Sequence, residues 1–174
     1  PEIQENLQAE IDRVVGRSRF PTIDDRKNMP YAEATIRETI RKGTVIPLGV
    51  GRRATKETTL GGYLIPENTL LLPNIWGHHN DPEFWGDPEN FRPERWIDSD
   101  GKLMRKDTTF GFGAGKRLCA GETFARNTMF LFLTGLMQNL TFALPAGQKL
   151  PDFENQLNGI SLSLPDYWVE AIPR

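Results

Sequence analysis

Apolar residues in the first 43 positions recur at the spacing of two amphipathic helices. In residues 3–14 they fall every three or four positions, and Gly16 provides a stop. Residues 31–42 show the same spacing and are followed by Gly43, a residue type that commonly ends helices. A polar, proline-containing stretch separates the two segments. The pattern therefore predicts two helices joined by a loop.

Between residues 45 and 72 the pattern changes to short runs of β-forming residues. These runs are broken by Gly61-Gly62 and by Pro66-Glu67-Asn68, which are typical turn sequences. The segment is therefore predicted to form a small antiparallel meander. The following residues 80–115 show no lasting period, and an irregular stretch of this length in a compact domain usually has a function.

The end of the chain predicts one more helix and a hairpin. Residues 122–139 are strongly apolar with helical spacing, so we expect a well-buried third helix. Its expected buried positions are Phe124, Met129, Phe132, Leu133 and Leu136. Further on, apolar residues alternate over 160–164 before the turn sequence Pro165-Asp166. This alternation predicts a closing hairpin with residues 168–172.

Composition narrows the class of protein. At 174 residues and 38% hydrophobic residues, the chain has about the length of one domain and enough apolar material for a core. The 21 Lys and Arg nearly balance the 23 Asp and Glu, so nucleic acid is not an expected partner. The longest apolar run, residues 129–137, is shorter than the roughly 20 residues that cross a bilayer. Because the chain begins inside a helical pattern without an initiator methionine, we expect a piece of a longer protein with any membrane anchor upstream.

The single cysteine, Cys119, stands out chemically. One cysteine excludes an internal disulfide and a cysteine-only zinc site. It ends a glycine-rich stretch and precedes the predicted third helix, where free backbone N–H groups and the helix dipole favour a thiolate. Arg117 adds positive charge two residues away. Glycines at 113 and 121 allow a flat, bulky group to approach the backbone, and Phe112 is placed to shield the sulfur.

Such a thiolate suits a nucleophile, a redox sensor or a soft metal ligand. A nucleophile usually needs a histidine base, and the only candidates are the adjacent His78 and His79 in another segment. One cysteine and two histidines do not supply the four ligands of a zinc site. An inert buried cysteine is the commonest alternative, but it does not account for glycines and an arginine at fixed offsets.

The strongest resemblance lies in residues 112–121, whose sequence is Phe-Gly-Ala-Gly-Lys-Arg-Leu-Cys-Ala-Gly. It is similar, position for position, to the cysteine-ligand loop of the haem-thiolate monooxygenases, the cytochrome P450 family. The resemblance implies that Cys119 is the axial thiolate ligand of the haem iron. Residues 38–41, Glu-Thr-Ile-Arg, resemble the Glu-x-x-Arg motif of that family, and residues 91–96, Phe-Arg-Pro-Glu-Arg-Trp, resemble its proline-rich meander.

The resemblance also implies roles for further residues. Glu38, Arg41 and Arg95 are expected to form a buried ionic triad with a structural role. Without the cysteine loop, Glu38 and Arg41 would be interpreted as an ordinary surface pair. The residues expected to contact the haem, beside the ligand itself, are Arg52 and Arg117 at the propionates, and Phe112, Gly113, Gly121 and Ala125. Arg53 is expected on the opposite face of its strand. The substrate pocket is expected to include Ile46, Val50 and Ile160, with packing in a core as the alternative.

The resemblance is closest to the microsomal, family-2-like branch, and it covers the C-terminal third or so of the family fold. One departure is Lys42-Gly43, where relatives more often carry a bulky apolar residue. The implied fold is mainly α with a small antiparallel β component, and residues 1–174 are expected to form one incomplete domain. The long central helix of the family, with its acid–alcohol pair, is not in this chain.

The implied function is that of a monooxygenase that inserts one oxygen atom from O2 into a lipophilic organic substrate. Its cofactor would be haem b, iron protoporphyrin IX, with electrons from NADPH through NADPH-cytochrome P450 reductase. The implied location is the cytosolic face of the endoplasmic reticulum membrane, with membrane association only through an upstream region. Two alternatives stay open: a truncated, non-catalytic chain that binds haem weakly or not at all, and a haem-thiolate isomerase or peroxygenase that uses no reductase.

Overall fold

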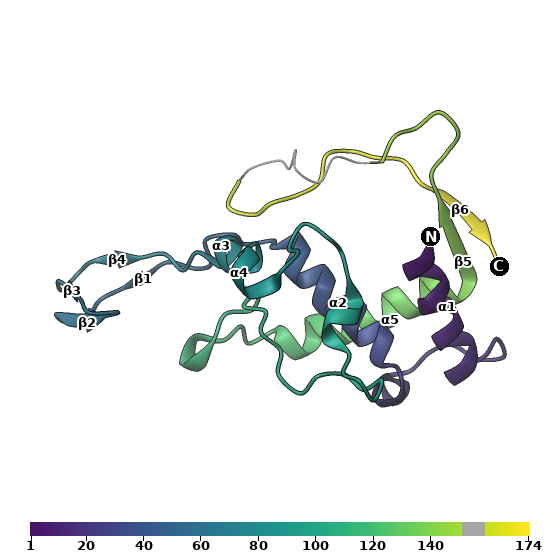
Figure 1. The fold of residues 1–174 in the computed structure, drawn as a ribbon, viewed down its shortest axis with the longest axis horizontal. Helices are drawn as coiled ribbons and strands as arrows, with labels where there is room; N and C mark the ends of the chain where they lie inside the picture. Colours follow the sequence, from purple (N-terminus) through teal and green to yellow (C-terminus); the bar gives the residue numbers. More distant parts are fainter. Residues whose placement is uncertain (151–158) are drawn as a thin grey trace.

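Three long helices form the centre of the molecule (Figure 1). The computed structural model describes residues 1–150 and 159–174. Helices α1 (Glu2–Val14), α2 (Pro30–Gly43) and α5 (Glu122–Asn139) pack against one another, and the short η1 (Ile23–Asn28) lies between the first two in the chain. Their shared core consists of Leu7, Ile11, Val15, Met29, Ala32, Ile36 and Phe130. The two predicted N-terminal helices and the third helix are therefore present.

The start of α2 is fixed by a side chain of α1. The carboxylate of Glu10 accepts hydrogen bonds from the backbone N–H groups of Tyr31, at 3.0 Å, and Ala32, at 2.8 Å. These N–H groups lie in the first turn of α2, where no backbone carbonyl is available to them. Burial raises the pKa of Glu10, although these two hydrogen bonds act in the opposite direction. A carboxylate from one helix thus caps the next.

The strands are short and pair in antiparallel fashion. The pairs are β1 (Arg52–Arg53) with β4 (Leu70–Leu71), β2 (Thr58–Leu60) with β3 (Tyr63–Ile65), and β5 (Leu140–Ala143) with β6 (Glu170–Pro173). The first two pairs form a ribbon that extends away from the helices in Figure 1. Its tip turns at Gly61 and Gly62, both with positive φ, as the turn sequences predicted. The expectation of a mainly helical chain with small antiparallel sheets is confirmed.

Two expectations for the end of the chain are wrong. Residues 170–173 pair with residues 140–143, not with 160–164, so the predicted closing hairpin does not form. Helix α5 is also only partly buried: Phe124 is 77% exposed and Phe132 is 67% exposed. Because α5 carries apolar residues around most of its circumference, only the stripe through Phe130 meets the other two helices.

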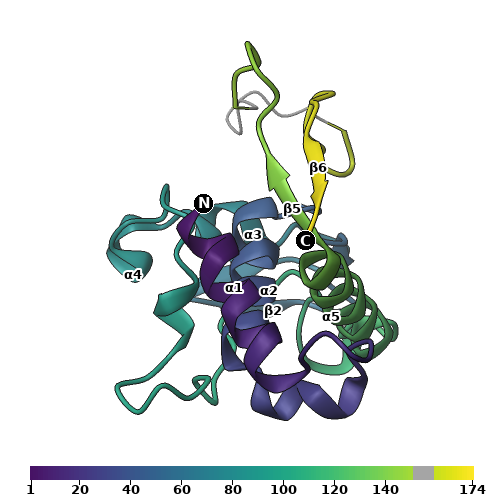
Figure 2. The same cartoon turned by 90° about the vertical axis from the view of Figure 1, so that its right-hand side faces the viewer.

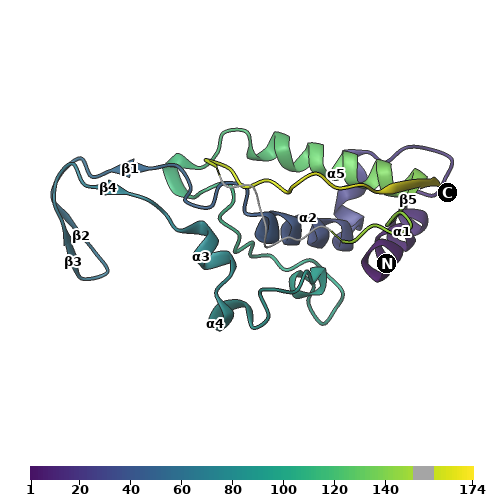
Figure 3. The same cartoon turned by 90° about the horizontal axis from the view of Figure 1, so that it is seen from above.

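Helix α2 lies between two layers (Figures 2 and 3). On one side it meets α5. On the other it meets the irregular segment (residues 75–110), which contains α3 (Ile75–His79), α4 (Pro82–Trp85) and η2 (Pro93–Trp96). A second apolar cluster, formed by Ala34, Trp85 and Trp96, fills the latter contact. No helix within residues 1–150 and 159–174 is long and apolar enough to cross a membrane.

Candidate functional site

A buried ion network joins α2 to the irregular segment. The side chains of Glu38 and Arg41 are both fully buried. Arg41 donates from Nη2 to Glu38 Oε1 at 2.7 Å and from Nε to Glu38 Oε2 at 3.0 Å. Arg95, from η2, donates from Nε to Glu38 Oε1 at 3.1 Å. The structure therefore brings together the three residues that the sequence placed in a triad.

The remaining hydrogen-bonding capacity of Glu38 and Arg41 is directed to backbone groups around them and to the side chain of Trp96. Glu38 also accepts from the N–H of Arg92, at 2.9 Å, and from Nε1 of Trp96, at 3.0 Å. Arg41 donates to three backbone carbonyls, those of His79, Pro88 and Asn90. Burial alone would raise the pKa of Glu38, but its hydrogen bonds, chiefly those from Arg41, hold it below the ordinary value. A charged pair at such depth is stable only with this full set of partners.

The cysteine loop follows the irregular segment and leads into α5. Its backbone is closed by hydrogen bonds from Gly113 N–H to Phe110 O, at 2.8 Å, and from Cys119 N–H to Phe112 O, at 2.9 Å. Gly113 has φ +78°, a conformation that glycine adopts without steric cost. After the one-turn η3 (Gly115–Arg117), Gly121 forms the N-cap of α5, and Ala125 N–H bonds to its carbonyl. The loop thus places Cys119 three positions before the first residue of α5, Glu122.

The Cys119 side chain is exposed at this position. The Phe112 ring does not enclose it; the guanidinium carbon of Arg126 lies 5.2 Å from the centroid of that ring. Arg126 is itself held by Glu122, at 2.7 Å, and by Asp107, at 2.9 Å. In this structure the sulfur is exposed, whereas the Phe112 ring stacks on a cation of α5.

The beginning of the loop is seated closely on α2. A Cβ atom added to Gly111 would lie 2.6 Å from Cγ2 of Ile40, well inside van der Waals contact. Asp107, just before it, accepts from Thr109 and lies 3.7 Å from Nε of Arg37 on α2. The glycine at 111 therefore allows a backbone approach that no other residue type would permit without movement.

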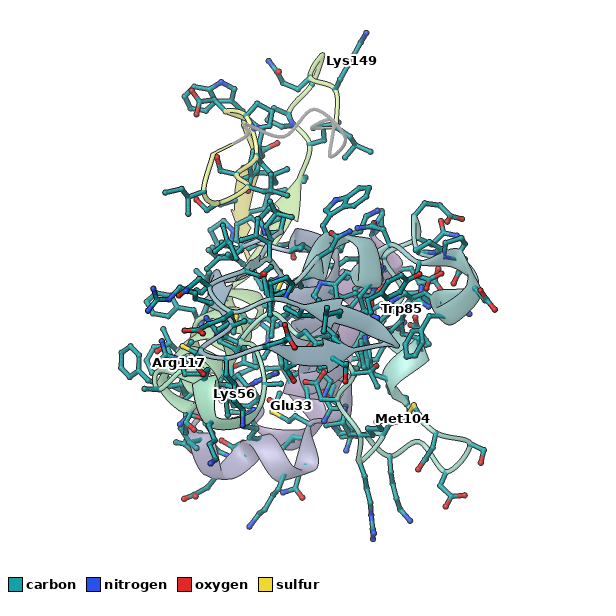
Figure 4. The ribbon with its side chains drawn as sticks, turned by 90° about the vertical axis from the view of Figure 1, so that its left-hand side faces the viewer. Glu33, Lys56, Trp85, Met104, Arg117 and Lys149 are labelled. Carbon is teal, nitrogen blue, oxygen red and sulfur yellow. The ribbon has the colours of Figure 1, made fainter. Side chains whose placement is uncertain are left out.

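Basic residues gather beside the cysteine loop. A hollow of about 280 Å³ is lined by Val50, Arg52, Lys116, Arg117 and Leu118. It brings together the two arginines that were expected at the haem propionates, and it adds Lys116. Among the residues that the structure describes, none that lines this hollow carries a carboxylate. Figure 4 shows Arg117 and Trp85 on opposite sides of the molecule, so this hollow is distinct from the aromatic end of the irregular segment.

The three expected pocket residues are all exposed. The exposed fraction is 36% for Ile46, 60% for Val50 and 93% for Ile160. Within the described part of this chain, none of the three packs in a core. Leu162 N–H bonds to Val45 O at 2.8 Å, which places the segment around Ile160 beside the segment around Ile46.

The two histidines that the sequence offered as candidate bases lie away from the cysteine. His78 and His79 bind backbone and threonine groups, not Cys119, and neither is arranged as the base of a cysteine nucleophile. In the described part of the chain, no group of three or more His, Cys, Asp or Glu side chains is arranged to hold a metal ion. Asp107 and Arg126 beside the loop were not singled out by the sequence, because isolated charged residues give no periodic signal.

Comparison with known proteins decides the family. The family model described as "Cytochrome P450" matches residues 1–170. The chain belongs to the cytochrome P450 family. Cytochrome P450 2U1 of Homo sapiens is 46% identical over 151 residues, which is 87% of this chain and 28% of that protein. Cytochrome P450 2J1 of Oryctolagus cuniculus is 42% identical over 174 residues, covering 100% of this chain and 34% of that protein.

A third relative, cytochrome P450 2J2 of Homo sapiens, is 44% identical over 150 residues, covering 86% of this chain and 30% of that protein. The chain therefore spans about a third of the length of the curated relatives it matches. The relatives are named as family 2 cytochromes P450, which agrees with the branch that the sequence resembles. The partial cytochrome P450 fold expected from the sequence is thus confirmed.

Proposed function

We propose that this chain supplies the proximal, ligand-bearing part of a haem-thiolate monooxygenase. The observation that carries the proposal is the exposed Cys119 at the end of a glycine-rich loop, beside the basic hollow. A cysteine sulfur, two guanidiniums and glycines that lack a β-carbon match what a flat iron porphyrin with two carboxylates requires. The residues in the described structure therefore fit haem b.

Each of these residues has a separate task in the proposal. Cys119 Sγ would bind the haem iron. Arg52 and Arg117 would pair with the propionates, since a guanidinium suits a carboxylate in bidentate geometry. Gly113, Gly121 and Ala125 would leave room for the ring, and Phe112, at the start of the loop, would contact it. When bound, the haem supplies the activation of dioxygen, which is the chemistry of the family.

The buried triad has a structural task in this proposal. Glu38, Arg41 and Arg95 tie the irregular segment to α2, and the cysteine loop follows directly from that segment.

In the whole protein we propose a lipophilic substrate near Ile46, Val50 and Ile160, with electrons from NADPH through NADPH-cytochrome P450 reductase. A location on the cytosolic face of the endoplasmic reticulum membrane is part of the same proposal. Residues 1–174 are proposed to be a single part of one larger domain.

The test is a haem titration of the 174-residue chain, followed by reduction and addition of carbon monoxide. We expect a thiolate-type Soret band from the unaltered chain and its loss in Cys119→Ser. Arg52→Ala should weaken haem binding roughly tenfold, whereas the neighbouring Arg53→Ala serves as a matched control with less than about a twofold effect. The same band in Cys119→Ser as in the unaltered chain would contradict the ligand assignment.

A second candidate is a chain that binds haem weakly or not at all. It is favoured by the exposure of Ile46, Val50 and Ile160, which leaves one side of the proposed pocket open to solvent. In that case the titration gives no thiolate-type band from the unaltered chain. The two candidates are therefore separated by the first spectrum.

A further inference from the structure

The two adjacent histidines hold the segment that begins the cysteine loop. His78 Nε2 lies 2.9 Å from the carbonyl oxygen of Thr108, and the N–H of Phe110 donates to His79 Nε2 at 3.1 Å. In an extended chain these two backbone groups point to the same side, and in a parallel sheet one residue of a neighbouring strand would bind both. The two imidazole rings of α3 therefore take the place of a strand partner around Thr109.

The partners of His79 determine which of its nitrogens carries the hydrogen. Because the N–H of Phe110 can only donate, Nε2 must be the acceptor and the ring must be neutral. The hydrogen is then on Nδ1, which donates to Thr44 Oγ1 at 2.8 Å. Thr44, the C-cap of α2, in turn donates from Oγ1 to the carbonyl of Arg41. All these hydrogen bonds run in one direction, from the loop to the end of α2.

The same histidine joins the cysteine loop to the buried ion network. Arg41 Nη1 donates to the backbone carbonyl of His79 at 2.8 Å. On the loop side, Phe110 O accepts from Gly113 N–H, and two residues later Phe112 O accepts from Cys119 N–H. The His79 side chain is fully buried, so water cannot replace either of its partners. The position of Phe110 is thus set from α2 through one imidazole ring.

We propose that His79 is a positioning residue that fixes the cysteine loop on α2 as the neutral tautomer with hydrogen on Nδ1. Its effect on Cys119 rests on the proposed function, whereas its effect on the loop does not. The charged and titratable groups that face it are His78, Arg41 and Asp107. Burial is the main reason that the pKa of His79 is lowered to about 4, so the ring is neutral at physiological pH.

The first test needs no haem. In the 174-residue chain labelled with ¹⁵N, we expect a scalar coupling across the hydrogen bond between Phe110 N and His79 Nε2, together with the ¹⁵N shifts of the tautomer with hydrogen on Nδ1. A tautomer with hydrogen on Nε2 would overturn the proposal. His78→Phe, which retains a ring against Phe84 and Phe110, is the matched control and should keep the coupling.

The second test distinguishes positioning from a general loss of stability. His79→Phe keeps an aromatic ring but binds neither partner, and His79→Gln retains an oxygen that can accept from Phe110. By hydrogen exchange, His79→Phe should accelerate exchange in residues 107–119 roughly tenfold, with residues 31–43 unchanged, and His79→Gln should restore most of the protection. Equal acceleration in both segments would show a merely structural role and overturn the proposal.

The third test measures how His79 affects haem ligation by Cys119. In the haem-loaded chain, we expect His79→Phe to lower the thiolate-type fraction of the carbon monoxide band and His79→Gln to restore it. An unchanged band in His79→Phe would overturn the link between His79 and Cys119. If the unaltered chain gives no such band, the proposed function fails, and the coupling and exchange measurements still decide whether His79 positions the loop.

Discussion

Replacing Glu38 by glutamine tests the ion network most directly. The carboxylate accepts hydrogen bonds from Arg41, Arg95, the Arg92 N–H and Trp96, and it is fully buried. In Glu38→Gln the amide NH2 group must face donors that it cannot bind. At the Oε2 position it would oppose Arg41 Nε and Trp96 Nε1, and the buried Arg41 would lose its counter-charge.

The magnitude follows from the depth of the pair. Removing one partner of a buried ion pair destabilises a protein by about 3–5 kcal/mol, because the remaining charge stays in a low-dielectric site. For Glu38→Gln we expect a loss in this range. Breaking the network should also release the irregular segment from α2, since Glu38 binds both η2 and its own helix.

The assay is urea unfolding followed by tryptophan fluorescence. Trp85 and Trp96 lie in the same cluster as the network, so their emission reports its opening. Asp100→Asn is the matched control, because it removes a carboxylate whose partner Lys102 is 76% exposed, and surface pairs of this kind contribute little. If Glu38→Gln and Asp100→Asn unfold at the same urea concentration, the argument from burial is refuted.

Three further predictions concern single contacts. The pKa of His79 is about 4 in the folded chain, against an ordinary value of 6.5. Its contribution to the free energy of unfolding is therefore complete above pH 6.5 and falls by about 3 kcal/mol as the pH drops to about 4. An acid titration of stability that has the same slope in His79→Gln as in the unaltered chain would contradict this. Gly111→Ala should lower the free energy of unfolding by about 1–3 kcal/mol, because the added Cβ would overlap Ile40 Cγ2. In thermal unfolding, the double variant with Ile40→Ala should recover part of this loss. If the losses from the two substitutions simply add, the contact is refuted. Glu10→Gln should cost about 1–2 kcal/mol by weakening the cap of α2, measured by calorimetry against the exposed control Glu5→Gln, and equal stability of the two variants would disprove the cap.

The helices were predictable from the sequence because their signal is local. Apolar spacing located all three long helices, and turn residues located the strands between residues 45 and 72. The pairing of residues 140–143 with 170–173 was not predictable in this way, since it depends on contacts between distant segments. The exposure of Phe124 and Phe132 was missed for another reason. A helix that is apolar all round does not show in its own sequence which side meets a neighbour.

In the candidate site, too, some residues were predictable from the sequence and others were not. The resemblance of residues 38–41, 91–96 and 112–121 to family motifs led to the triad and the cysteine loop before any geometry was known. The sequence did not indicate the positioning role of His79, because two adjacent histidines form no pattern that reveals their hydrogen-bond partners. Its role depends on Thr44 and Phe110, which lie 35 and 31 residues away along the chain.

Helix α5 packs against α1 and α2, which are made much earlier, and this order determines when the core can form during synthesis. Arg26 binds Asn127, which follows it by 101 residues, and Gln8 binds the Leu140 carbonyl 132 residues later. At the usual rate of about 5–20 residues per second, a ribosome needs roughly 5–20 s to add the intervening hundred residues. Throughout that interval the faces of α1 and α2 that later bury Phe130 remain open. The contacts between Phe130 and these two helices therefore cannot form until α5 has been made.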